Sequence, residues 1–195
     1  MNQYVALLRG INVGGKNLIK MTALEACLEE QGLLEVRTYI QSGNVLFQSA
    51  EGRVKLTNRM ERTLASRFNY QARVVLRSKK QLLAIIEGAP KGFGLHPGDY
   101  RYDVLFLKEP LTAPAAMKSV LIKQGVDEVA AGSGVLYFSR LISRARESQL
   151  SRIVSMPVYQ NMTIRNWNTT TKLLGMMESQ HRPGAATRTK RSSSR

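Results

Sequence analysis

Two strand-like runs meet at a turn signal in Val36-Arg37-Thr38-Tyr39-Ile40-Gln41-Ser42-Gly43-Asn44-Val45-Leu46-Phe47-Gln48-Ser49. The β-branched and aromatic residues of 36–41 and 45–49 favour strands, and Ser42-Gly43-Asn44 favours a hairpin turn between them. A related stretch returns later, where Gly132-Ser133-Gly134 separates strand-like runs at 126–131 and 135–139. Two hairpins of one kind predict a chain built from two similar halves.

The elements around the first hairpin follow the order βαββαβ and then a helix. They are a strand at 4–9, a helix at 21–31, the two hairpin strands, a helix at 54–68, a strand at 72–76 and a helix at 79–87. Thr22 and Glu25 have capping-box spacing at the first helix, and Ser78 is placed to cap the last one.

The second half repeats this order after a connector that holds six Gly and Pro residues between 88 and 98. Its elements are a strand at 102–107, a helix at 114–124, the second hairpin, a helix at 143–154, a strand at 162–165 and a helix at 169–177. We therefore predict an α+β fold of two tandem split-βαβ (ferredoxin-like) subdomains, in which helices cover one face of an antiparallel sheet. The predicted subdomains are 1–88 and 101–179, joined by the connector at 89–100 and followed by a disordered basic tail at 180–195.

Length and composition limit what the chain can be. Its 195 residues suffice for one large domain or two small ones, and 43% apolar and 22% charged residues are ordinary for a globular protein. No apolar run approaches the roughly 20 residues of a membrane helix, the N-terminus lacks a signal-peptide pattern, and Cys27 is the only cysteine. We expect a cytoplasmic protein with no membrane contact, no intrachain disulfide and no cysteine-based zinc site.

Positive charge is the strongest compositional signal. Lys and Arg number 29 against 14 Asp and Glu, a formal net charge of +15. Residues 181–195 hold five of the basic side chains and no acidic one, so residues 1–180 keep 24 basic against 14 acidic side chains, a net of +10. This balance favours a polyanionic partner, nucleic acid or a nucleotide, although a basic surface can also serve solubility alone.

A glycine-rich loop follows the first strand as Arg9-Gly10-Ile11-Asn12-Val13-Gly14-Gly15-Lys16-Asn17. Backbone N–H groups in such a loop can surround an anion, and Arg9 and Lys16 add positive charge. The loop matches the P-loop pattern, but Asn17 stands where Ser or Thr would hold Mg²⁺, and the predicted helix begins about five residues too late. We interpret it as a looser phosphate site, with a purely structural loop as the alternative. Its candidate ligand-binding residues are Arg9, Gly10, Asn12, Gly14, Gly15, Lys16 and Asn17.

A second candidate block runs from Met162 to Lys172, where a strand end meets a helix cap. Arg165 offers a guanidinium fork for phosphate, and Trp167 offers a flat ring on which a base can stack. In the alternative interpretation Asn168 or Thr169 caps the helix, Trp167 fills core and Arg165 lies at the surface. The candidate ligand-binding residues of this block are Arg165, Asn166, Trp167, Thr169 and Lys172. The sequence leaves open whether this block and the Arg9 loop face one cleft.

Three blocks of this sequence resemble an uncharacterised bacterial family, known as domain of unknown function 1697. They are the stretch from Tyr4 to Asn17, the stretch from Thr38 to Val45, and Arg165-Asn166-Trp167-Asn168-Thr169 with Lys172-Leu173-Leu174. The resemblance covers roughly residues 1–178 and implies a cytoplasmic α+β protein of two similar subdomains. It brings no established activity. Thr163-Ile164 departs from the Thr-Thr that the family usually has, and the basic tail is not part of the family pattern.

Several chemistries lack the residues that they need. His96 lies in the connector and His181 in the tail, no metal-ligand spacing occurs, and no carboxylate pair is favoured for acid–base work. We therefore expect no metal and no cofactor. The stretch of Arg140, Arg144, Arg146 and Arg152 is interpreted as a solvated helix face, with a nucleic-acid contact as the alternative.

Three classes of function remain open from the sequence. The first is a protein that binds a phosphate-bearing ligand, nucleic acid or a nucleotide, through the glycine-rich loop and the basic surface. The second is an enzyme that acts on a small phosphorylated or carboxylated substrate, with the same loop as an anion clamp. The third is a structural or assembly module in which the motif residues only stabilise the fold.

Overall fold

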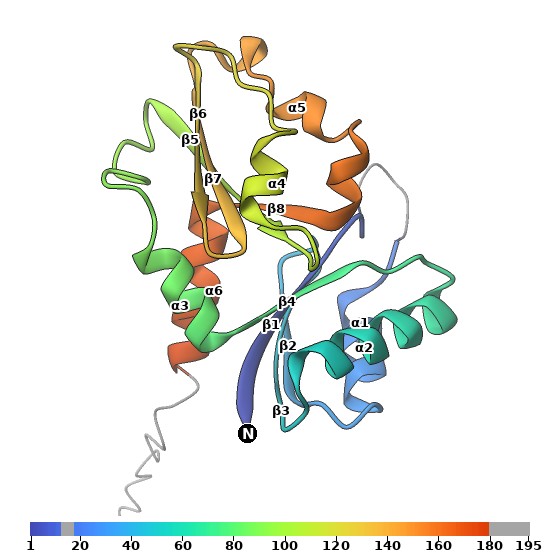
Figure 1. Cartoon of the computed structure of the whole chain (residues 1–195). Coiled ribbons are helices and arrows are strands. Elements are labelled where there is room, and N and C mark those ends of the chain that lie inside the picture. The colour runs from blue at the N-terminus through green and yellow to red at the C-terminus, as the bar shows by residue number, and fades with distance from the viewer. Residues whose placement is uncertain (13–17, 180–195) are drawn as a thin grey trace, which may run out of the picture.

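A computed structural model describes residues 1–12 and 18–179, which form two four-stranded antiparallel sheets and their helices (Figure 1). The first half contains β1 (Asn2–Leu8), α1 (Met21–Glu29), β2 (Leu34–Tyr39), β3 (Asn44–Ser49), α2 (Arg53–Phe68), β4 (Val74–Ser78) and α3 (Lys79–Glu87). The second half contains β5 (Tyr100–Leu107), α4 (Ala113–Met117), β6 (Asp127–Gly132), β7 (Val135–Leu141), the 3₁₀ turn η1 (Ala145–Glu147), α5 (Leu150–Ile153), the 3₁₀ turn η2 (Pro157–Asn161), β8 (Met162–Asn166) and α6 (Trp167–Ser179). The predicted α+β class and its antiparallel sheets are confirmed.

The two sheets share one strand order. It is β2-β3-β1-β4 in the first sheet and β6-β7-β5-β8 in the second, with every pairing antiparallel. In each half the first strand therefore lies centrally, between the second hairpin strand and the last strand. This common order supports the two similar halves that the hairpins predict, while the finer ferredoxin-like classification and the boundary at 89–100 stay predictions.

Both faces of the central strands are buried, which explains their nearly unbroken apolar runs. In β1, Tyr4, Ala6 and Leu8 pack on the outer face, against the helices of the first half, whereas Val5 and Leu7 pack on the inner face. The expectation that helices cover one face is thus incomplete, since the other face of each sheet is also covered.

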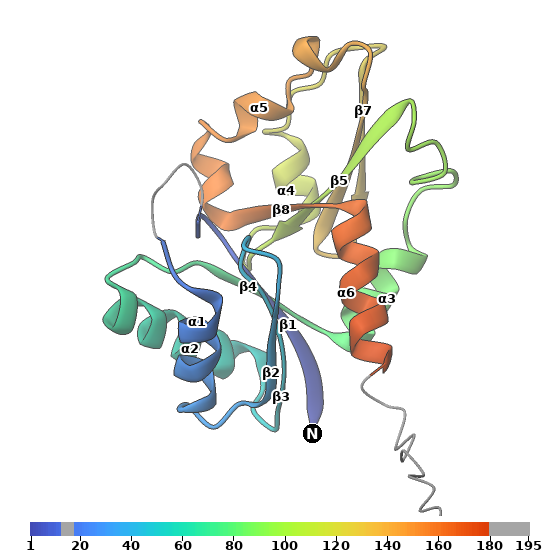
Figure 2. The same cartoon turned by 180° about the vertical axis from the view of Figure 1, so that it is seen from behind.

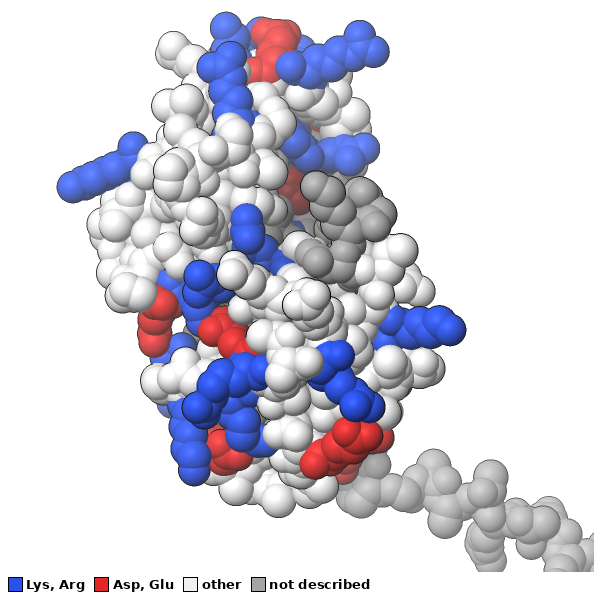
Figure 3. Space-filling view, turned by 90° about the vertical axis from the view of Figure 1, so that its right-hand side faces the viewer, with Lys and Arg blue, Asp and Glu red and all other residues white. Residues whose placement is uncertain are grey.

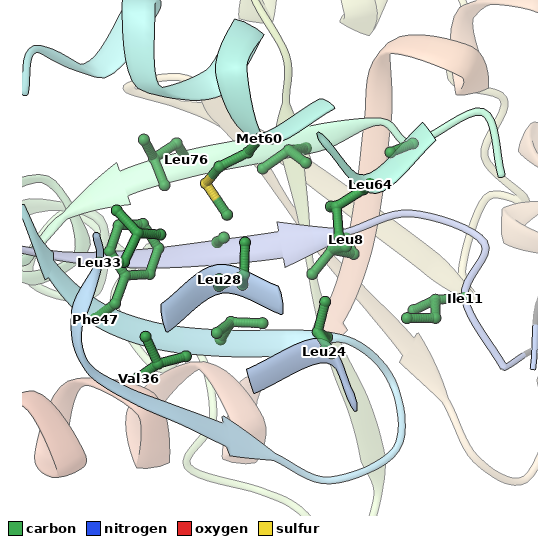
Figure 4. Close-up of a cluster of buried hydrophobic side chains, with 14 of the residues drawn as sticks. Leu8, Ile11, Leu24, Leu28, Leu33, Val36, Phe47, Met60, Leu64 and Leu76 are labelled. Carbon is green, nitrogen blue, oxygen red and sulfur yellow. The ribbon is translucent and has the colours of Figure 1, made fainter. Parts of the chain in front are cut away.

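The outer face of the first sheet packs on α1 and α2. Figure 4 shows the side chains of this cluster converging between the sheet and the helices, with Leu24 and Leu28 from α1 and Met60 and Leu64 from α2. The i, i+4 spacing within each pair places both members on one side of its helix. A corresponding outer cluster in the second half includes Leu105, Phe138, Leu150 and Ile153.

The inner faces of the two sheets share a central cluster with α3 and α6. Val5 and Leu82 come from the first half, and Phe106, Tyr137 and Leu173 come from the second. Figures 1 and 2 show α3 and α6 side by side in both views, and the two helices contact each other. The core is therefore continuous from one half to the other.

Two predicted helices of the second half are much shorter than expected. The helix at 114–124 stops at Met117, because the following apolar Leu121 and Ile122 are about half exposed and have no core to pack on. The helix at 143–154 is interrupted at Ser148. There the Ser148 Oγ accepts the Leu150 N–H and the Asp127 carboxylate accepts the Gln149 N–H, so these donors do not continue a helix.

The capping box predicted at Thr22 and Glu25 is wrong. The helix begins at Met21 with Lys20 at the N-cap position, so Thr22 lies inside its first turn. Glu25 instead accepts hydrogen bonds from the backbone N–H and the hydroxyl of Thr38 on β2, at 2.6 and 2.8 Å. The cap predicted at Ser78 is confirmed, as a complete capping box with Gln81.

Candidate functional site

Arg165 lies at the centre of the junction between the two halves. It is 8% exposed on β8, and its guanidinium donates only to protein acceptors. Nε bonds to Asn44 Oδ1 at 2.5 Å, Nη1 to Thr163 Oγ1 at 2.7 Å, and Nη2 to the Leu8 and Ser42 carbonyls at 2.9 Å. Burial lowers the pKa of Arg165 to about 10, which still leaves it charged at neutral pH. The sequence-predicted phosphate fork therefore faces the first half of its own chain.

Asn44 explains why the first hairpin can receive this arginine. Its side chain is fully buried, and Nδ2 donates to the Tyr39 carbonyl and the Ser42 hydroxyl, both at 3.0 Å. The amide thereby fixes its own Oδ1 toward Arg165. The hairpin turn predicted at 42–44 is confirmed, and Asn44 also has the side-chain role that the sequence only left open.

Arg9 follows β1 and lines a polar hollow of about 370 Å³ at the end of the first sheet. We call this the basic hollow; its lining residues are Arg9, Gly10, Asn69, Tyr70, Gln71, Arg73 and Gln160. Two arginines contribute positive charge, three side-chain amides contribute donors and acceptors, and no acidic residue is among the described residues that line it. Such a set of groups suits an anion that accepts several hydrogen bonds.

The backbone around the basic hollow is firmly held. The Arg9 N–H donates to the Arg73 carbonyl at 2.9 Å, and the Tyr70 hydroxyl donates to the Arg9 carbonyl. The Arg9 guanidinium lies 4.6 Å from the centroid of the Tyr159 ring, in cation–π contact. Its buried Nε has no hydrogen-bond partner within the described parts of the chain. The fold thus fixes the position of Arg9, while its Nε–H remains a hydrogen-bond donor without an acceptor among the described residues.

The other residues predicted in the glycine-rich loop have different positions. Asn12 adopts a left-handed φ of 53°, and its side chain bonds both the N–H and the carbonyl of Ile19 and also the Gln41 carbonyl. The Asn12 amide therefore connects the start of this loop to its end at Ile19 and to Gln41 in the turn of the first hairpin. The other candidates, Gly14, Gly15, Lys16 and Asn17, lie outside the described residues.

The block after Arg165 forms the start of α6. Asn166 is its cap, because Asn166 Oδ1 accepts the Thr169 N–H at 2.7 Å; the expected cap at Asn168 or Thr169 is therefore wrong by two or three residues. Thr169 is buried, whereas Lys172 is exposed on the helix. Trp167 is partly buried and packs edge-on against Phe93 of the connector, with ring centroids 5.1 Å apart.

Trp167 lines a second hollow, of about 260 Å³, which shares no residue with the basic hollow. We call it the aromatic hollow; its lining residues are Pro97, Tyr100, Arg101, Tyr102, Asp103, Arg140, Asn166, Trp167 and Asn168. The basic hollow includes Gln160, before β8, and the aromatic hollow includes Asn166, at its end. The structure thus places Arg9 and Trp167 in different cavities. The buried Arg165 lies on β8, between Gln160 of the basic hollow and Asn166 of the aromatic hollow in the sequence.

Asp103 and Arg140, which both line the aromatic hollow, form a partly buried ion pair. Asp103 Oδ2 lies 3.4 Å from Arg140 Nη2, and neither Asp103 Oδ2 nor Arg140 Nε makes a hydrogen bond to a described residue. Burial raises the pKa of Asp103, an effect that the nearby Arg140 partly offsets. No local pattern singles out Asp103, but three aromatic residues between 93 and 102 are a local signal for this region.

The predicted basic helix face does not form. Arg140 lies on β7, Arg144 precedes η1 and pairs with Glu147 at 2.6 Å, Arg146 lies on the 3₁₀ turn η1, and Arg152 lies on the α-helix α5. The physical reason is the interruption at Ser148 described above. Lysines and arginines on the face shown in Figure 3 lie over both halves, with acidic residues among them.

Within residues 1–12 and 18–179, no group of three or more His, Cys, Asp and Glu side chains is arranged to hold a metal ion. No helix in the same part of the chain is both long and apolar enough to cross a membrane. The Cys27 thiol is buried, and burial raises its pKa.

Comparisons with known proteins agree with this architecture. A family model described as "Protein of unknown function (DUF1697)" matches residues 1–137. Among solved structures, the conserved bacterial protein SP0830 from Streptococcus pneumoniae is similar, with a TM-score of 0.81 and 27% sequence identity over 90% of this chain and 98% of that chain. No curated protein matches the chain.

Proposed function

The chain belongs to the DUF1697 family of proteins of unknown function, and we propose that it binds a phosphate-bearing ligand, nucleic acid or a nucleotide, at the basic hollow. The observation that carries this proposal is that Arg9 and Arg73 both line one cavity, in which no described lining residue is a carboxylate. Guanidinium groups give phosphate oxygens charge-assisted hydrogen bonds, which are about twice as strong as neutral ones.

The position of Arg9 supports this assignment. The Tyr159 ring and the Tyr70–Arg9 bond hold the residue in place, so binding a ligand costs little additional side-chain entropy. The buried Nε without a partner is a donor that an anion could satisfy. Arg165, in contrast, has a structural role, because acceptors of the protein itself satisfy its donors.

The charge of the chain supports a polyanion as the ligand. Residues 1–180 carry a net charge of +10, so phosphates are attracted from a distance and counterions are released on contact. Of the sequence-predicted residues, this proposal retains Arg9 and Gly10 and adds Arg73, Gln71 and Gln160. Placement in the cytoplasm, expected from the sequence, belongs to the same proposal.

The test compares two double variants of the full chain by fluorescence polarisation with labelled single-stranded RNA across a salt series. Arg9→Ala with Arg73→Ala is expected to weaken binding about tenfold or more and to flatten the salt slope by about 1.4 units, roughly 0.7 for each lost phosphate contact on a single strand. The matched control is Lys55→Ala with Arg62→Ala, which removes the same charge from exposed positions on α2. A labelled nucleotide in place of RNA then separates a small ligand from a polymer.

Equal weakening by both double variants would show that binding follows overall charge, and the basic hollow would lose its role. Binding that neither variant changes would exclude this hollow as well. Circular dichroism of each variant establishes that a loss of binding is not a loss of fold.

A further inference from the structure

The strand β6 (labelled in Figure 1) forms one edge of the second sheet, outside β7. The Leu141 N–H donates to the Val126 carbonyl at 3.0 Å, so in this register residues 128, 130 and 132 bond toward β7. The N–H and the carbonyl of Val129 and of Ala131 therefore point away from the sheet. Within residues 1–12 and 18–179, nothing bonds these groups, and they are available to an incoming strand.

The other edge strands differ from β6, because side chains bond their backbones. On β2, Glu25 accepts the Thr38 N–H at 2.6 Å, and on β4, Glu61 accepts the Val74 N–H at 2.7 Å. On β8, Arg165 Nη1 donates to a strand carbonyl at 2.8 Å. Such bonds protect a sheet edge from pairing with another chain. Among the described edge strands, β6 alone lacks them.

A cavity of about 390 Å³ lies beside β6 on the inner face of the second sheet, and we call it the inner cavity. Ala130 of β6 lines it, together with the aromatic side chains of Phe93, Tyr100, Tyr102 and Tyr137. Side chains opposite each other on neighbouring strands lie on the same face of a sheet. A peptide residue paired opposite Ala130 therefore directs its side chain toward the inner cavity.

The lining of the inner cavity favours an aromatic side chain. The Phe93 ring lies edge-on to Tyr102 at 4.9 Å and to Tyr137 at 5.4 Å, so a further ring can extend this packing. Lys91 and Glu128 both line the cavity and are exposed. Their charges are opposite, so the cavity offers little net attraction to a charged side chain.

A second copy of this chain fits the edge poorly. Pairing of β6 with itself would place only Glu128, Ala130 and Gly132 on the inner face, and none of them is a ring that could fill the cavity. Residues 1–180 carry a net charge of +10, so two copies repel each other. The same charge attracts an acidic peptide.

We propose that β6 binds an extended acidic segment of a partner protein as an added antiparallel strand, with an aromatic side chain of that segment in the inner cavity. The backbone groups of Val129 and Ala131 supply affinity, and the cavity supplies specificity. This inference does not rest on the function proposed for the basic hollow, which shares no lining residue with the inner cavity.

The test measures binding of a fluorescein-labelled, capped peptide, Glu-Glu-Val-Thr-Phe-Thr-Val-Glu-Glu, to the full-length protein by fluorescence polarisation. Saturable binding is expected, and Ala in place of Phe is expected to weaken it about tenfold. Methylation of either Thr amide is expected to weaken binding about tenfold or more, because these amides face β6 when Phe lies opposite Ala130. Methylation of the Phe amide, which points away, leaves binding unchanged.

Two variants of the protein assign the effect to β6. Ala131→Pro removes an outward N–H without removing a bond to β7 and is expected to weaken binding about tenfold or more. Ala130→Leu fills the inner cavity and is expected to remove the preference for Phe over Ala in the peptide. Ala131→Leu is the control for both, because it keeps the N–H and projects from the opposite face. Thermal melting establishes that each variant is folded.

Three results would overturn the proposal. The first is a lack of saturable peptide binding, and the second is an equal effect of the three amide methylations. The third is a dimer of the unaltered protein, seen by light scattering, that Ala131→Pro converts to a monomer, because this edge would then belong to a second copy. The first two need no variant, so they decide the matter even if Ala131→Pro does not fold.

Discussion

Two buried arginines connect the halves without a carboxylate partner. Arg77 on β4 donates to the Leu107 and Gly134 carbonyls of the second half at 2.7 and 2.8 Å, and Arg165 on β8 donates to Leu8 and Ser42 of the first. Burial lowers the pKa of each to about 10. Because carbonyl oxygens satisfy the donors, these charges are tolerated in the interior and fix the position of one half on the other.

Arg165→Ala is expected to lower the free energy of unfolding by about 3 kcal/mol or more, because it leaves several buried acceptors without a donor. Urea unfolding measures this difference. Arg152→Ala, which removes an exposed arginine on α5, is expected to change stability by less than about 0.5 kcal/mol. If the two variants unfolded at the same urea concentration, Arg165 would not hold the junction.

At the scale of elements, the connector between α3 and β5 is fixed by its contact with α6. Gly94 has a φ of +87°, and a Cβ there would lie 2.3 Å from Trp167 Nε1. Gly92 has the same φ of +87° but open space around its Cβ position. The two glycines therefore separate the cost of backbone conformation from the cost of displacing Trp167.

Gly94→Ala and Gly92→Ala are both expected to lose about 1–2 kcal/mol from left-handed backbone strain. Only Gly94→Ala is expected to lose more and to shift the emission of Trp167, because the new methyl group pushes the indole from its place. Tryptophan fluorescence and thermal melting of the two variants make the comparison. An unshifted spectrum in Gly94→Ala would contradict the contact.

At the scale of the whole molecule, the central cluster makes the two halves one cooperative unit. Side chains from both sheets and from α3 and α6 share this cluster, and the two buried arginines cross the same junction. Each inner sheet face packs on a helix of its own half, α3 on β1 and β4 and α6 on β5 and β8, and these two helices also pack on each other. Separating the halves would therefore expose apolar side chains of this shared cluster to water.

We therefore expect a single unfolding transition for the described part of the chain. Trp167 emission reports on the second half, and hydrogen exchange at the β1 and β3 amides reports on the first. Their transitions in urea should coincide. Two separated midpoints would show that each half is stable alone and that the central cluster contributes little.

The sequence alone determined the order of the elements, both hairpins and the two similar halves, because these depend on local signals. The Ser42-Gly43-Asn44 turn, the apolar runs of the central strands and the Ser78 capping box act over a few residues and are visible in one dimension. The predicted boundaries of two helices were wrong. The helix at 114–124 ends early because its later apolar residues have no core to pack on, and the helix at 143–154 is interrupted where the distant Asp127 carboxylate binds its backbone.

Only the tertiary structure decided what the charged and aromatic residues do. Arg9 and Arg165 looked alike as phosphate ligands, yet contacts across more than 100 residues bury Arg165 among carbonyls and leave Arg9 beside an open cavity. Asp103, Arg73 and Phe93 gained their places through strand pairing and helix packing. A side chain's partners depend on which segments the fold brings together, and the free energy of burying a charge depends on those partners.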